Sequence, residues 1–197
     1  MTESLNKNSK GEIIILNNDL LNSDNENIIV RGFKTEGDLL IGFTQLVNEK
    51  QPNIILGYNI FLFDLPYMKK RADLTGVSFQ FLKFSKIPSI PSKEEEINWS
   101  SKAFGDQKFK YLNSHGILWI DLFLLIKREY TTLSSYSLKN VSTHFLGEEC
   151  TKDPLTVKGI FKCYRLFTSK SLAIVGKYCT KDSFVTLKLF ENLQQWI

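Results

Sequence analysis

The stretch GYNIFLFDLPYMKKRA, residues 57–72, places Asp64 between a short apolar run and a helix-like pattern. NIIL, residues 53–56, is a compact apolar run followed by a glycine, which predicts an interior strand of a parallel sheet covered on both faces. Pro66 fits the first turn of a following helix, and Gly76 fits its end. The stretch therefore predicts a strand, a loop and a helix, with a carboxylate just past the strand.

Short β-branched runs elsewhere in the chain predict further strands. They occupy residues 12–16 and 27–33, and residues 109–121 predict two strands joined by a His-Gly turn. The intervening residues 77–110 have a looser pattern and predict a surface excursion. The length of the chain favours one domain covering residues 1–197.

Apolar residues at helical spacing predict further helices. Their expected starts are Thr35, Asp121, Ser137 and Ser171. Thr35 resembles the first residue of a capping box with Asp38, and Asp121 is most simply a helix cap, although an acid at a strand end could also support a site. Strands that alternate with helices favour the α/β class.

The composition excludes several classes of protein. A hydrophobic content of 43% argues against disorder, and a net charge of +4 permits nucleic-acid binding without indicating it. Apolar runs are too short for a membrane span and the polar start resembles no signal peptide, so we expect an intracellular protein. No Gly-rich phosphate loop occurs, and His115 and His144 lack partners at metal-ligand spacing.

The C-terminal helix pattern contains an acidic residue on an apolar stripe. Tyr178, Asp182, Val185 and Leu189 lie at positions i, i+4, i+7 and i+11, so Asp182 is expected to point inward. A buried carboxylate is costly unless it is hydrogen-bonded, paired with a cation or bound to a metal. A structural salt bridge, or a place at the edge of the stripe, would also explain this residue.

Asp64, like Asp182, has both a functional and a structural explanation. In open α/β sheets, ligands collect beyond the carboxyl ends of the strands, where Asp64 is expected. The alternative is helix capping, because an Asp at a helix start is stabilised by free N–H groups and by the helix dipole. The pairing of Asp64 with a distant Tyr-x-x-x-Asp pattern favours a functional site.

Residues 57–72 resemble the second exonuclease motif of family B DNA polymerases, in which an Asn precedes an aromatic-Asp pair. YCTKD, residues 178–182, resembles the third motif, Tyr-x-x-x-Asp. The segment between them is similar in order and spacing, including the Ser-Tyr-Ser-Leu and His-Phe-Leu-Gly runs. The resemblance extends from about Asn27 to the C-terminus and is greatest to delta-type polymerases and their relatives in large DNA viruses.

The resemblance implies an RNase H-like proofreading domain, with a mixed sheet and flanking helices, that trims the single-stranded 3′ end of a DNA primer. Such sites hold two divalent metal ions, most often Mg²⁺ or Mn²⁺, which activate a water and stabilise the leaving oxygen. By this resemblance Asp64 and Asp182 would bind metal and Tyr178 would orient the attacking water. Asn59 and Phe63 would bind the primer end.

The first motif of the family, an Asp-x-Glu on an apolar strand, has no convincing match. Asp24-Asn25-Glu26 lies among polar, turn-forming residues, whereas a metal-binding pair needs a rigid strand. We therefore expect a domain that lacks its first strand or strands, is inactive in isolation, and assembles with the remaining segments of a polymerase. Two alternatives are a non-catalytic scaffold that binds DNA or protein, and an RNase H-like nuclease unconnected with replication.

Overall fold

The computed structural model describes residues 11–16, 28–101, 105–147 and 155–193. Contacts divide the chain into two compact units. Unit 1 comprises Met1–Leu39 and Lys139–Ile197, and unit 2 comprises Leu40–Leu138. Each unit has its own secondary structure, so the single domain expected from chain length stays a prediction.

Helix α1, Glu36–Lys50, begins at the predicted capping box. The Asp38 backbone N–H donates to Thr35 Oγ1 at 3.1 Å, and the Thr35 hydroxyl donates to the Asp38 carboxylate at 2.7 Å. Leu40 and Val47 lie on the inner face of this helix and are buried. Local capping and helical periodicity thus place α1 as predicted.

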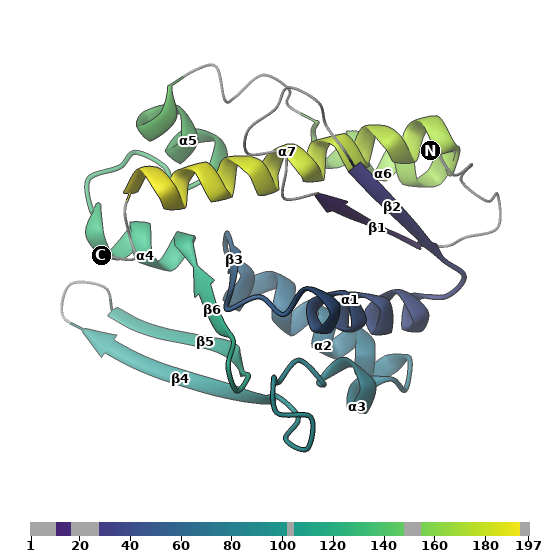
Figure 1. The fold of residues 1–197 in the computed structure, drawn as a ribbon. Coiled ribbons are helices and arrows are strands. Elements are labelled where there is room, and N and C mark those ends of the chain that lie inside the picture. The colour runs from purple at the N-terminus through teal and green to yellow at the C-terminus, as the bar shows by residue number, and fades with distance from the viewer. Residues whose placement is uncertain (1–10, 17–27, 102–104, 148–154, 194–197) are drawn as a thin grey trace. The chain divides into compact units, whose positions relative to one another are not determined.

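Strand β3, Ile54–Gly57, pairs in parallel with β6, Leu118–Asp121. The parallel pairing agrees with the prediction for NIIL, and Figure 1 shows the two strands side by side. The prediction of an interior strand covered on both faces is wrong for the described residues, because Ile54 is 42% exposed and β3 and β6 form a two-stranded sheet. One edge of β3 therefore has no strand neighbour among the described residues.

A π-helical turn, η2, Ile60–Asp64, connects β3 to helix α2, Leu65–Leu74. Pro66 lies in the first turn of α2, as predicted. Gly76 follows the helix with a φ of 74°, a conformation that favours glycine, so it ends the helix as expected. The turn η2 is the feature of this segment that the sequence pattern does not predict.

The expected surface excursion at residues 77–110 instead contains regular structure. It includes the short helix α3, Ser78–Phe81, and an antiparallel ribbon formed by β4, Lys93–Ser101, and β5, Gly105–Asn113 (Figure 1). The consecutive Glu residues of β4 have partners on β5: Lys110 bonds Glu94 at 2.7 Å, Tyr111 bonds Glu95 at 2.7 Å, and Lys108 bonds Glu96 at 3.0 Å. Cross-strand pairing thus offsets the repulsion between neighbouring Glu side chains.

The core of unit 2 is an aromatic cluster between helices and strands. Phe84 is fully buried and its ring lies 5.1 Å from that of Phe81, 5.5 Å from that of Trp119 and 5.8 Å from that of Phe43. All three contacts are edge-to-face, the arrangement that aromatic rings favour. The core therefore includes residues of the predicted excursion.

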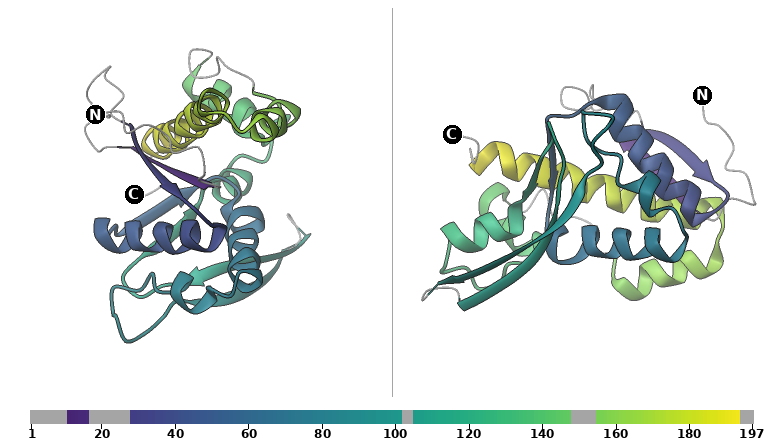
Figure 2. Two further views of the ribbon diagram at one scale, coloured as in Figure 1. Left: turned by 90° about the vertical axis from the view of Figure 1, so that its right-hand side faces the viewer. Right: turned by 90° about the horizontal axis from the view of Figure 1, so that it is seen from below.

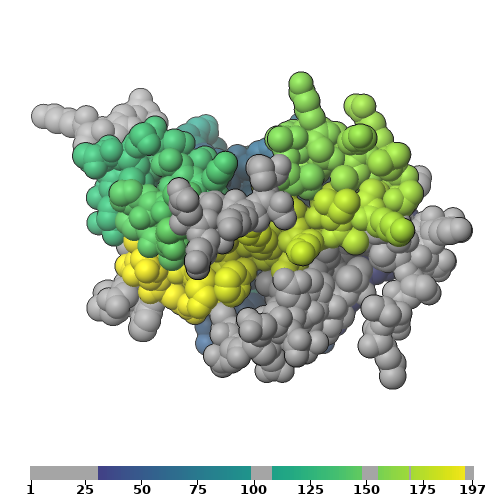
Figure 3. All heavy atoms as spheres, turned by 90° about the horizontal axis from the view of Figure 1, so that it is seen from above, coloured from purple at the N-terminus to yellow at the C-terminus, as the bar shows by residue number. Residues whose placement is uncertain are grey.

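Unit 1 contains an antiparallel pair, β1, Gly11–Leu16, and β2, Ile28–Phe33, both close to their predicted ranges. Its helices are α5, Leu138–Leu146, α6, Val157–Leu166, and α7, Ser169–Leu193. Helix α6 was not predicted; Thr156 caps it by accepting from the Gly159 N–H at 3.2 Å. Figure 2 shows α6 beside the first half of α7, and the two helices form one continuous surface in Figure 3.

The described strands confirm an α/β protein, with parallel and antiparallel pairs in separate two-stranded sheets rather than in one mixed sheet. The helix that ends the unit 2 part of the chain, α4, Leu122–Glu129, follows β6 directly. Within the described ranges, none of the helices combines the length and apolar character that crossing a bilayer requires.

Replacing Phe84 by Ala should lower the free energy of unfolding by about 3 to 5 kcal/mol, because it removes a buried ring and leaves a cavity. Urea denaturation measures this loss. Phe79→Ala is the matched control, because Phe79 is 67% exposed. It should lower the free energy of unfolding by only about 0.5 to 1 kcal/mol, the usual contribution of an exposed cation–π contact such as that of Phe79 with Lys83. Equal losses in the two variants would contradict the assigned core.

Candidate functional site

Asp64 lies at the junction of η2 and α2, just past the carboxyl end of β3. It occupies the N-cap position of α2, but its side chain accepts no capping hydrogen bond. The residue is exposed. The structure therefore does not support the capping alternative, and Asp64 lies at the edge where ligands collect in open α/β sheets.

Asp121 lies at the carboxyl end of the neighbouring strand, opposite Gly57 in the register of β3 and β6. It caps α4, as predicted, by accepting from the Phe123 N–H at 3.0 Å. The same carboxylate also accepts from the N–H groups of Asn59, at 2.7 Å, and Phe61, at 3.0 Å. These two bonds, which join α4 to the π-helical turn, were missed by the sequence reasoning.

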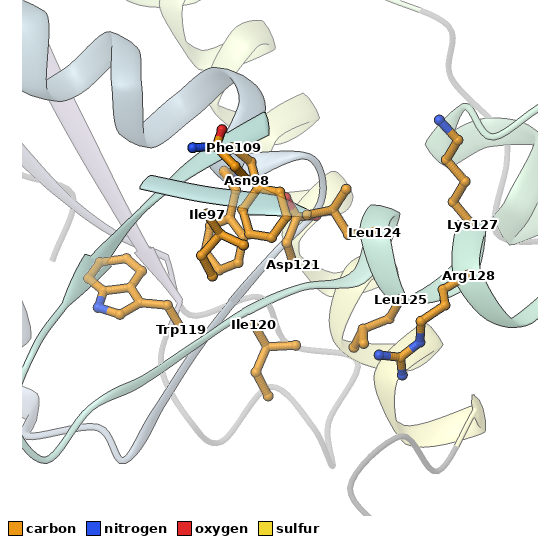
Figure 4. A pocket seen from close by; sticks show the side chains of 11 residues that line it. Ile97, Asn98, Phe109, Trp119, Ile120, Asp121, Leu124, Leu125, Lys127 and Arg128 are labelled. Carbon is orange, nitrogen blue, oxygen red and sulfur yellow. The ribbon is translucent and has the colours of Figure 1, made fainter. Parts of the chain in front are cut away.

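The surroundings of Asp121 are largely apolar. A hollow of about 510 Å³ lies against Asp121 between the β4–β5 ribbon, β6 and α4 (Figure 4). Phe61, Ile97, Phe109 and Leu124 are among the residues that line it. Burial raises the pKa of Asp121, and the hydrogen bonds from backbone N–H groups oppose this rise by stabilising the carboxylate.

The charge of Asp121 also acts on its neighbours. Protein atoms displace part of the water around Asp64 although the residue is exposed, and this desolvation raises the pKa of Asp64. A hydrogen bond from the backbone N–H of Asp64 opposes the rise, and the charge of Asp121 adds to it. Burial and then the charge of Asp121 also raise the pKa of Tyr58, whose hydroxyl donates to the Tyr136 carbonyl at 2.7 Å. A divalent cation at Asp64 would oppose this negative potential.

Asn59 and Phe63 flank the same turn. Asn59 adopts the left-handed conformation, with a φ of 65°, and its Oδ1 is buried without a hydrogen-bond partner in the described part of the chain. Phe63 is 63% exposed, and its ring stacks on Tyr67 with centroids 6.1 Å apart. The turn thus gathers Asn59, Phe63 and Asp64 on one short segment.

Tyr178 and Asp182 lie one helical turn apart on α7 in unit 1. Val185 and Leu189 of the predicted stripe are buried, whereas Tyr178 and Asp182 are half-buried. The pKa of Asp182 is raised by burial, and a hydrogen bond from Tyr178 opposes this rise. Burial and the charge of Asp182 raise the pKa of the Tyr178 hydroxyl, which keeps it protonated. The meeting of Asp182 with Asp64 stays a prediction.

Carboxylate oxygens are suitable ligands for hard divalent cations. Within residues 11–16, 28–101, 105–147 and 155–193, no group of three or more His, Cys, Asp or Glu side chains forms a ready metal site. Asp24 and Glu26 lie outside the described residues. His115 and His144 are exposed. The metal site expected at Asp64 and Asp182 therefore stays a prediction.

Replacing Tyr178 by Phe should raise the pKa of Asp182 further, because the lost hydroxyl donates to the charged form of the carboxylate. An NMR titration of the Asp182 carboxyl carbon measures the change. Tyr111→Phe, which removes a phenolic hydroxyl that donates to Glu95, should leave this pKa unchanged. An unchanged or lower pKa in the Tyr178 variant would contradict the assigned hydrogen bond.

Known proteins show clear similarity to this chain. The family model for the exonuclease domain of family B DNA polymerases matches residues 5–141, a range that includes Asp64 but ends before Tyr178. DNA polymerase 120R of Invertebrate iridescent virus 3 is 44% identical over 171 residues, which cover 83% of this chain and 15% of the relative. The DNA polymerase delta catalytic subunit of Candida albicans is 33% identical over 158 residues, which cover 80% of this chain and 15% of the relative.

The putative DNA polymerase 060R of Frog virus 3 is 35% identical over 168 residues, which cover 85% of this chain and 16% of the relative. The chain thus spans only 15% to 16% of the length of these relatives. The resemblance stated from the motifs is confirmed. Because the family model matches more than half of its residues, the chain belongs to the family of family B DNA polymerase exonuclease domains.

Proposed function

We propose that this chain supplies part of a 3′-5′ proofreading site, which hydrolyses nucleotides from the single-stranded 3′ end of a DNA primer. The observation that carries the proposal is the exposed position of Asp64, which follows a parallel strand and caps no helix. A structural Asp at a helix start would use its oxygens on the helix N–H groups. Family membership supports DNA as the substrate.

The proposal includes two divalent metal ions, Mg²⁺ or Mn²⁺, with Asp64 and Asp182 as ligands. The oxygen chemistry of both carboxylates fits such cations. Bound metal ions would supply an activated water and would stabilise the leaving oxygen of the phosphodiester. The raised pKa values of Asp64 and Asp182 mean that a nearby cation would also relieve an electrostatic cost of ionising these acids.

Tyr178 is proposed to orient the attacking water. Its hydroxyl is held by Asp182, which fixes the direction of the phenol on α7. The raised pKa of Tyr178 keeps the hydroxyl protonated at neutral pH, so it can donate one hydrogen bond and accept another. Such a group positions a water without abstracting its proton.

Asn59 and Phe63 are proposed to bind the end of the primer. The exposed face of Phe63, extended by the stacked ring of Tyr67, offers an aromatic surface to an unpaired base. Bases of single-stranded DNA stack on such surfaces with little sequence preference. The position of Asn59 at the start of the same turn as Phe63 supports it as the second residue of this contact.

The RNase H-like sheet is proposed to be completed by a further strand of the polymerase that carries an Asp-x-Glu pair. The edge of β3 that has no strand neighbour among the described residues supports this proposal. Two-stranded sheets are marginal by themselves, and an open edge pairs readily with another strand. Other segments of a DNA polymerase are thus the proposed partners.

The proposal is tested with a 5′-labelled single-stranded oligonucleotide and Mg²⁺. The chain should trim the 3′ end when mixed with the segment of the Invertebrate iridescent virus 3 polymerase that precedes the matched region. Asp64→Asn and Asp182→Asn should each lower the rate by about 100-fold or more, because outer-shell changes alone cost 10- to 100-fold. Gel analysis of the products measures the rate.

Asp73→Asn is the control for this experiment. It removes the same charge from α2, where Asp73 pairs with Lys69 at 2.7 Å on the surface. Trimming that survives in the Asp64 variant, or no trimming in an assembly proven by ultracentrifugation, would contradict the proposal. DNA binding that persists without any trimming would favour the scaffold alternative.

Phe63→Ala should weaken the binding of single-stranded DNA by about 1 to 3 kcal/mol, the usual contribution of one base stacked on an aromatic side chain. Fluorescence anisotropy with the same oligonucleotide measures the affinity. Phe79→Ala removes an equally exposed ring from α3 and should leave the affinity unchanged. Similar losses in both variants would show general hydrophobic binding instead.

A further inference from the structure

We propose that Asp121 is a positioning residue that holds the π-helical turn and thereby sets the direction of Asp64. The effect on trimming rests on the proposed function, whereas the effect on the turn does not. The hydrogen bonds of the Asp121 carboxylate go to backbone N–H groups and not to Asp64 or Asp182. Asp121 would therefore act through the backbone of η2.

The geometry of the carboxylate carries this inference. Its Oδ1 accepts from the N–H groups of Asn59, at 2.7 Å, and Phe123, at 3.0 Å, while Oδ2 accepts from the Phe61 N–H at 3.0 Å. Hydrogen bonds to an ionised acceptor are roughly twice as strong as neutral ones. Both oxygens are therefore engaged, and they connect η2 to the first turn of α4.

The turn needs such an anchor because its backbone is unusual. Asn59 lies in the left-handed region and is followed directly by a π-helical turn, a conformation that is rare and often marks a functional site. Sparsely populated conformations persist when the surrounding structure determines them. The turn also folds closely over the end of β3, since a Cβ added at Gly57 would clash with the Ile60 side chain.

The burial of Asp121 explains why its carboxylate needs all of these hydrogen bonds. Asp121 is only 3% exposed and lies at the junction of β6 and α4 beside Leu124 (Figure 4). The groups that stabilise its charge are backbone N–H groups, those of Phe61, Asn59, Phe123 and Leu124. Losing those donors would leave a buried charge without compensation, so carboxylate and turn hold each other in place.

The parallel register of β3 and β6 places Asp121 beside the start of the turn. Gly57, the last residue of β3, pairs with Asp121, the last residue of β6, so the segments that leave the two strands start side by side. The segment after β3 carries Asp64, and the segment after β6 is α4. Asp121 thus links the proposed active-site turn to the rigid helix beside it.

Asp121→Ser separates the two roles of this residue. Serine is a good helix cap, so it should still accept from the Phe123 N–H, but its single oxygen cannot also serve both donors of η2. Amide hydrogen exchange of the 197-residue chain, followed by NMR, should accelerate about 10-fold or more at Asn59 and Phe61, and change little at Phe123. Unchanged exchange at Asn59 and Phe61 would overturn the inference.

Two further variants keep the test decisive. Thr156→Ala removes the cap of α6 in unit 1 and should not change exchange in η2, which controls for general destabilisation. If the serine variant does not fold, Asp121→Asn retains one carbonyl acceptor and replaces the other oxygen with an NH₂ group. Exchange should then accelerate at one of the two η2 amides, and unchanged rates at both would overturn the inference.

The trimming assay tests the consequence for the site. Asp121→Ser should lower trimming and raise the Mg²⁺ concentration for half-maximal rate at least about 10-fold, as other supporting residues around metal ligands do. Faster exchange in η2 with normal trimming and normal Mg²⁺ dependence would overturn the positioning role. If the unsubstituted assembly itself fails to trim, the proposed function fails, while the exchange result still decides whether Asp121 anchors the turn.

Discussion

The buried negative charge of Asp121 is the constraint on which the local structure of the site depends. A carboxylate in an apolar surrounding must be neutralised or fully hydrogen-bonded. Here it draws backbone N–H groups from the turn after β3 and from the start of α4. The requirement to satisfy one charged group therefore fixes the relative positions of a strand end, a π-helical turn and a helix.

Two Asp residues lie at or beyond the carboxyl ends of neighbouring parallel strands and have opposite environments. Asp121 is buried and its oxygens are used within the protein, while Asp64 is exposed and caps no helix. The first residue is proposed to hold the turn in place, and the second is proposed to bind an external ligand. A site built for a metal ion requires both, since ligands must be held in place by groups that are themselves fixed.

Features that depend on local chemistry could be predicted from the sequence. The capping box of α1, the place of Pro66 in α2, the turn at Gly76 and the cap at Asp121 all follow from residues within a few positions of one another. The family and the apolar stripe of α7 could also be predicted. These elements need no information about distant partners.

Features that depend on distant partners were missed. The β4–β5 ribbon contains consecutive Glu residues that become favourable only beside Lys110, Tyr111 and Lys108. The turn η2 requires a carboxylate more than fifty residues away along the chain. The side chain of Asp64 could not be distinguished from a cap, because both roles place the same residue type at a helix start.

We propose that Asp64 and Asp182 bind the same metal site. NMR line broadening by Mn²⁺ in the chain assembled with the preceding polymerase segment tests it most directly. Signals around residues 64 and 182 should broaden together at the same Mn²⁺ concentration, and Asp182→Asn should weaken the broadening at both positions. Broadening around residue 64 that is unaffected by Asp182→Asn would contradict the shared site.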